Sequence, residues 1–176
     1  MKANLIELPA FNVDFGEVED DGASCLFGRA FLPEKWLEEG EFSPFTFYVG
    51  RINLAEFNCL QGFNEGFLYF FAEAKNFNLN CLNAKVRYYS GEIDAYTDYN
   101  EGFFDDEETE NRSFKMVPCE SGDETVLFSS GEKLVLLSIK SEYLPFEIDG
   151  KALEFSVEKS SASKGDFSKC KITVKL

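Results

Sequence analysis

The chain has 176 residues, of which 44% are hydrophobic, and it contains twenty Phe but one Trp. A chain of this length and apolar content can bury roughly two thirds of its unfolded surface in one domain, which excludes disorder as its main state. The formal net charge of −15 repels nucleic-acid phosphates and anionic lipid surfaces. We therefore expect one domain over residues 1–176, which binds neither nucleic acid nor membrane and favours basic partners.

The termini and cysteines indicate the compartment. No apolar run approaches the roughly 20 residues of a membrane-spanning helix, and residues 1–7 lack the pattern of a secretory signal. The five cysteines are an odd number without a C-x-x-C pair, which favours free, mostly buried thiols over disulfides or a zinc site. They are Cys25, Cys59, Cys81, Cys119 and Cys170. We expect a cytoplasmic protein.

In the first half of the chain, runs of aromatic and β-branched residues bounded by Gly, Asn or Ser predict strands. These runs cover residues 23–27, 45–49, 66–72, 85–89 and 92–97. Two short helices are expected. Residues 33–40 begin with Pro and end with Gly, as helices commonly do. Asn53 has the position of an N-cap, with Glu56 three residues later, and Gly62 predicts that this second helix ends after two turns.

The second half of the chain ends in three predicted strands. Residues 133–140 enclose a continuous apolar run typical of a central strand, and residues 153–157 alternate between apolar and polar. Residues 170–176 alternate in the same way, which predicts a half-buried strand. Residues 113–117 and 125–128 give weaker strand signals. Together these patterns predict an α+β fold, mostly antiparallel sheet with two or so short helices.

Two parts of the chain resemble each other at a nearly constant distance. Residues 68–73 are similar to residues 153–158 at an offset of 85, and residues 85–87 are similar to residues 171–173 at an offset of 86. Two interpretations remain open: chance similarity between alternating strands, and two similar halves packed as one domain.

One family resemblance covers most of the chain from Gly28 onward. Residues 47–57, with the sequence FYVGRINLAEF, and residues 66–71, with the sequence GFLYFF, resemble the central signature of the YwqG-like proteins. Flanking matches are Gly28, Leu32, Pro33, Trp36, residues 86–89, residues 153–157 and the Asp-Phe-Ser turn at 166–168.

The resemblance has two departures and one implication. Arg51 stands where the family more often has Gln, and the family's His-containing, Gly-Pro-rich stretch has no counterpart between Asn111 and Glu132. The chain thus resembles a short, divergent member of this bacterial family of unknown function. The resemblance implies an α+β domain of mainly antiparallel strands and carries over no functional residue.

The absence of His narrows the catalytic chemistry. Ser-His-Asp and Cys-His mechanisms are excluded, because the chain has no histidine. Cys170 is the only thiol flanked by cations, but strand alternation points those lysines to the opposite face, which favours a core thiol. No Gly-rich phosphate-binding motif is present. We expect no catalytic residue, no metal and no cofactor.

The most conspicuous charged segment lies between Arg87 and Arg112, with nine carboxylates and no basic residue. An EF-hand beginning at Asp98 is disfavoured, because Gly102 comes one position early and Thr109 replaces the bidentate Glu. A glycosidase carboxylate pair cannot be singled out in so crowded a cluster. A solvated acidic loop and a binding surface for a basic partner remain open.

Aromatic residues within this segment favour the binding hypothesis, because aromatic anchors ringed by charge give both affinity and fast association. The predicted partner-binding residues are Asp94, Asp98, Tyr99, Glu101, Phe103, Phe104, Asp105 and Asp106. The function predicted is a non-catalytic, immunity-like interaction with a basic protein. The alternatives are a cation-dependent or small-molecule enzyme that uses carboxylates and Tyr, and a purely structural domain. Oligomeric state is not determined by these patterns.

Overall fold

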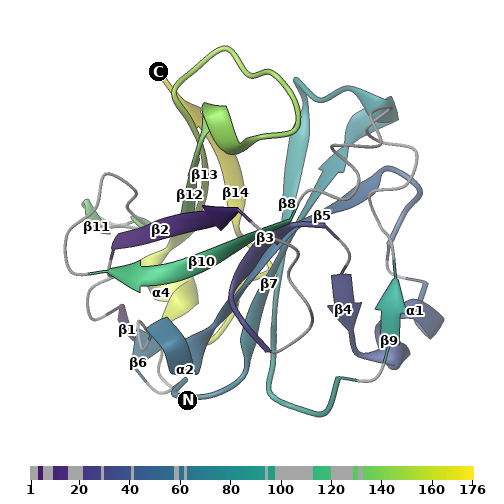
Figure 1. Cartoon of the computed structure of the whole chain (residues 1–176), viewed down its shortest axis with the longest axis vertical. Coiled ribbons are helices and arrows are strands. Elements are labelled where there is room, and N and C mark those ends of the chain that lie inside the picture. The colour runs from purple at the N-terminus through teal and green to yellow at the C-terminus, as the bar shows by residue number, and fades with distance from the viewer. Residues whose placement is uncertain are drawn as a thin grey trace.

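Figure 1 shows the computed structural model of the whole chain. The structure describes residues 4–5, 10–15, 22–28, 30–40, 42–57, 60–61, 63–93, 95–97, 113–119, 129–130 and 133–176. Side chains are described for residues 22–28, 30–40, 42–56, 63–93 and 133–176.

Two antiparallel sheets form most of the structure. The larger, six-stranded sheet has the order β2 (Ala10–Phe15), β10 (Ser113–Cys119), β3 (Cys25–Phe27), β5 (Thr46–Asn53), β7 (Phe67–Ala74) and β8 (Leu82–Tyr89). The four-stranded sheet has the order β11 (Ser129–Ser130), β12 (Lys133–Lys140), β13 (Ala152–Glu158) and β14 (Lys171–Lys175). Two short ribbons pair β1 (Asn4–Leu5) with β6 (Leu60–Gln61) and β4 (Ala30–Leu32) with β9 (Ala95–Thr97).

The short helices are α1 (Glu34–Glu38), α2 (Leu54–Phe57) and α4 (Lys159–Ala162), with 3-10 turns η1 (Lys75–Phe77) and η2 (Ser141–Tyr143). The predicted α+β fold of mainly antiparallel sheet is therefore confirmed. The strands β1, β2, β4, β6 and β11 were not predicted, and residues 125–128 lie outside the described residues. No helix in the described ranges combines the length and the apolar character needed to cross a bilayer.

The second helix is shorter than predicted. Asn53 caps it as expected, because its Oδ1 accepts a hydrogen bond from the Ala55 amide at 3.0 Å. The extension to Gly62 was wrong, since the chain already enters β6 at Leu60, where pairing with Leu5 of β1 replaces a further helical turn. The Glu56 carboxylate instead accepts hydrogen bonds from the amide and hydroxyl of Ser24, at 2.8 and 2.7 Å.

The six-stranded sheet is covered on both faces around β5 and β7. Its inner face packs against β12 and β13 in the main core, where Phe70 meets Phe155. Its outer face carries a second cluster that includes Trp36 of α1 and Tyr69 of β7. This double covering explains why seven consecutive residues of β5 are buried. The aromatic run at residues 67–71 therefore packs into the clusters on both faces of the sheet.

The two halves suggested by the sequence share register and irregularity. Phe70 of β7 pairs with Gly50 and Val86, and Phe155 of β13 pairs with Leu137 and Ile172. A register shift lies opposite residues 70–71 in one half and opposite residues 155–156 in the other. The triples β5-β7-β8 and β12-β13-β14 therefore match, at a sequence offset of 87 for the first strands, 85 for the second and 86 for the third. This agreement favours two similar halves over chance similarity.

Candidate functional site

The eight predicted partner-binding residues lie outside the described residues. They are Asp94, Asp98, Tyr99, Glu101, Phe103, Phe104, Asp105 and Asp106. The structure does describe the backbone on both sides of residues 98–112. Thr97 of β9 pairs with Ala30 of β4, and Ser113 of β10 pairs with Phe27 of β3. Through these pairs, the two flanks of the acidic segment are attached to β4 and β3, which follow one another in the chain.

The connection from β3 to β4 begins with two residues in unusual backbone conformations. Phe27 and Gly28 both have left-handed backbone conformations, with φ of 54° and 74°. Such a conformation is costly for a bulky residue, and burial of the Phe27 side chain at 2% exposure holds it in place. The two residues that flank residues 98–112, Thr97 and Ser113, therefore pair with strands on either side of the left-handed residues Phe27 and Gly28.

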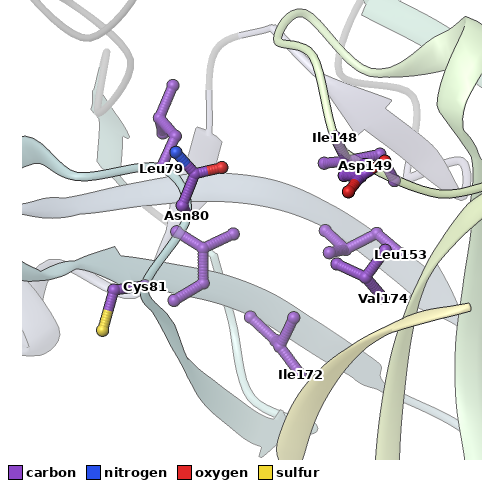
Figure 2. A pocket seen from close by; sticks show the side chains of 9 residues that line it. Leu79, Asn80, Cys81, Ile148, Asp149, Leu153, Ile172 and Val174 are labelled. Carbon is purple, nitrogen blue, oxygen red and sulfur yellow. The ribbon is translucent and has the colours of Figure 1, made fainter.

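A pocket of about 460 Å³ opens between the turn that precedes β8 and the end of β14. Both strands are edges of their sheets, and in Figure 1 they splay apart toward the C-terminal end of β14. In Figure 2, Leu79 and Cys81 lie on one side and Ile148, Leu153 and Val174 on the other. The pocket has a size typical of ligand sites.

Six of the nine lining side chains are apolar, and three carry polar groups. Leu79, Leu82, Ile148, Leu153, Ile172 and Val174 supply the apolar surface, and Asn80, Cys81 and Asp149 supply the polar groups. Cys81 is an exposed free thiol whose sulfur points away from Ile148 and Val174 in Figure 2. A second cavity of about 350 Å³ shares Ile148 and lies against residues 144–147.

The electrostatics of the pocket mouth are negative. Within the described part of the chain, neither Asp149 nor the neighbouring Glu147 has a hydrogen bond or an ion pair made by its side chain. The lysines beside them are engaged: Lys175 pairs with Glu154 at 3.3 Å, and Lys151 Nζ donates to the Leu176 oxygen at 3.4 Å. A cationic group that enters this pocket would meet a carboxylate without a competing partner.

The buried thiol and phenol of the described core do not form a reactive site. Burial raises the pKa of the Cys170 thiol to about 12 and holds the pKa of Tyr48 well above its ordinary value. Neither residue lines the pocket. Among the described side chains, no group of three or more Cys, Asp and Glu residues is placed to hold a metal ion.

The pocket was not anticipated from the sequence. Alternation predicted that the apolar face of the last strand is buried, but Val174 is 43% exposed because the larger sheet does not cover it there. The prediction of free thiols is confirmed for Cys25, Cys81 and Cys170, although Cys81 is exposed. Cys59 and Cys119 have no described side chains.

No protein family, curated protein or solved structure matches the chain.

Proposed function

We propose that the protein is a non-catalytic, immunity-like binding domain for a basic protein partner, which it contacts through the acidic segment at residues 92–110. The observation that supports this most is the distribution of charge along the chain. Residues with described side chains carry thirteen Asp and Glu against thirteen Lys and Arg. The rest of the chain carries the other nineteen acids against four basic residues.

The residues with described side chains, called the frame below, thus have no net formal charge. The remaining segments are strongly acidic. Several basic side chains of the frame lie over aromatic rings, such as Arg87 at 4.3 Å from the Trp36 ring and Lys35 at 4.7 Å from the Tyr89 ring. The field of the protein is therefore dominated by its acidic segments, which raise the association rate with a basic partner and disfavour acidic ones.

The attachment of the acidic segment also supports a binding role. Pairing of Thr97 with Ala30 and of Ser113 with Phe27 fixes both flanks of residues 98–112 to the sheets. Fixed flanks lower the conformational entropy that the segment loses when it binds.

We also propose that the chain is a divergent YwqG-like protein. The residues that carry the resemblance, 47–57 and 66–71, form β5, α2 and most of β7. These elements lie at the centre of the larger sheet, where packing restricts sequence most strongly. The proposal concerns ancestry and fold and adds no activity.

Affinity capture with charge-reversed variants tests the binding function. The test variant carries Asp98→Lys, Asp105→Lys and Asp106→Lys. The control carries Glu38→Lys, Glu65→Lys and Glu142→Lys, which changes the net charge equally at exposed positions of the frame. Lysates of the cells that produce the protein are compared by quantitative mass spectrometry.

We expect a basic protein to be captured by the wild type and the control but lost from the test variant. Equal loss from both variants would assign capture to net charge alone. Retention by the test variant, or capture of no basic protein by the wild type, would contradict the proposal.

A further inference from the structure

The pocket beside β14 has a counterpart in the other half of the chain, and that counterpart is filled. The offsets of 85 and 86 relate Ile148 to Phe63 and Val174 to Tyr88. The same offset of 86 relates Cys81, in the turn before β8, to Phe167, in the turn before β14. The pocket therefore takes two of these residues from the second half and Cys81 from the first, and its counterpart takes two from the first half and Phe167 from the second.

The counterpart site is closed by aromatic packing. The ring of Phe63 lies 4.5 Å from the Tyr88 ring and 6.0 Å from the Phe167 ring, in edge-to-face arrangements with both. Phe63 and Phe167 are 5% and 3% exposed and belong to the main core. The Tyr88 hydroxyl donates to the Glu65 carbonyl at 3.2 Å, which completes the closure.

Smaller side chains at the equivalent positions account for the pocket. Ile148 and Val174 are smaller than the Phe and Tyr at the equivalent positions, and the sulfur of Cys81, at the position equivalent to Phe167, points away from both, so that about 460 Å³ remains unfilled. An aromatic side chain from another molecule can therefore fill this space by packing its ring against the aliphatic side chains of the lining.

We propose that this pocket receives an aromatic side chain of the basic protein partner, with a neighbouring Lys or Arg of that partner on Asp149. The inference rests on the proposed function and names its apolar subsite. Asp149, which lines the pocket and has no ion pair among the described residues, supplies the charge complementarity. A second copy of this chain is disfavoured as occupant, because each copy carries a net charge of −15. The chain's own acidic segments are disfavoured for the same reason.

Three probes of similar size test the chemistry of the pocket: phenethylamine, 2-phenylethanol and 3-phenylpropionate. The chain has six Ile residues, of which Ile148 and Ile172 line the pocket and Ile52 and Ile139 lie in the core. Methyl NMR of Ile-labelled protein thus reports binding at the site with internal controls. We expect phenethylamine to shift the Ile148 and Ile172 methyl signals, with about two- to fivefold tighter binding than 3-phenylpropionate.

Two kinds of variant separate the apolar and charged contributions. Asp149→Asn is expected to abolish the preference for the amine while binding of 2-phenylethanol persists. Ile148→Phe and Val174→Tyr restore the residues of the filled site and are expected to abolish probe binding and to raise Tm by about 2–4 °C. Thr173→Tyr, on the opposite face of β14, is the control and is expected to leave probe binding unchanged.

The outcomes distinguish the pocket from the acidic segment. Absence of Ile148 and Ile172 shifts with phenethylamine, or equal binding of 3-phenylpropionate, would overturn the proposed chemistry. If Val174→Tyr captures the basic partner as well as Thr173→Tyr does, the role of the pocket in partner binding is overturned while the proposed function stands. If the wild type binds phenethylamine but captures no basic protein, the proposed function and the partner assignment fail together and the pocket remains a site for small aromatic cations.

Discussion

Phe70 and Phe155 occupy equivalent positions in the two halves and pack edge to face, with ring centroids 5.2 Å apart. Both side chains are fully buried, and each lies opposite the irregularity of its own strand triple. The contact between the two sheets is therefore centred on a residue and its own counterpart. A substitution at one position is therefore expected to alter the effect on stability of a substitution at the other.

Replacement of Phe70 and Phe155 by Leu, singly and together, tests this coupling. Each single change removes a buried ring and lowers the free energy of unfolding. The ring pair itself contributes about 0.5–1.5 kcal/mol beyond area burial, so the double variant should lose less than the sum of the single losses. Urea denaturation of the four proteins measures the interaction. Additive losses would show that the two rings are independent.

Gly66 is expected to tolerate no side chain. Its φ is +85°, and a Cβ atom there would lie 2.5 Å from the Tyr89 carbonyl oxygen. Gly66→Ala should therefore lower the free energy of unfolding by more than the roughly 1–2 kcal/mol that left-handed backbone alone costs. Gly40→Ala is the control, because Gly40 has φ +61° but no atom within 4 Å of its Cβ position. Equal losses for the two variants would refute the steric argument.

Burial of Cys170 should make stability depend on alkaline pH. Its pKa is raised from an ordinary value of 9.0 to about 12 in the folded state. Above pH 9 the unfolded thiol loses its proton first, so the stability contributed by Cys170 is complete below that pH and declines as pH rises toward 12. The decline is at most about 1.4 kcal/mol per pH unit. Denaturation of the wild type and Cys170→Ala at increasing pH measures it, and parallel profiles would contradict the prediction.

Ser24 should contribute to stability through the contact between β3 and α2. Its buried hydroxyl donates to Glu56 at 2.7 Å and accepts from the Asn53 amide at 2.8 Å. Ser24→Ala leaves this amide without its acceptor, which should lower the free energy of unfolding by about 1–3 kcal/mol. Exposed Ser160 gives the control variant Ser160→Ala, expected to be near neutral. Thermal denaturation compares the two, and a neutral Ser24→Ala would show that water replaces the hydroxyl.

Most strands with strong local patterns were predictable, and most strands of two or three residues were not. Residues 133–140 match β12, because a continuous run of apolar residues specifies a central strand. The run at residues 45–49 predicted only part of β5, since Gly50 and Arg51 interrupt the pattern although both are buried in the sheet. Strand β4 has three residues and β6 has two, too few for alternation to be detected, whereas β9 lies within the strand predicted at residues 92–97.

The sequence by itself determined the acidic balance, the exclusion of His-dependent chemistry, the mainly antiparallel fold and the offset between two similar segments, because composition and period-2 alternation are local properties. Only the tertiary structure decided that the offset corresponds to equivalent strand triples meeting at Phe70 and Phe155. It also decided that one half is closed by Phe63 and the other leaves a pocket beside Ile148. These depend on how side chains distant in the sequence fill shared space, and pairwise volume complementarity leaves no local pattern in the chain.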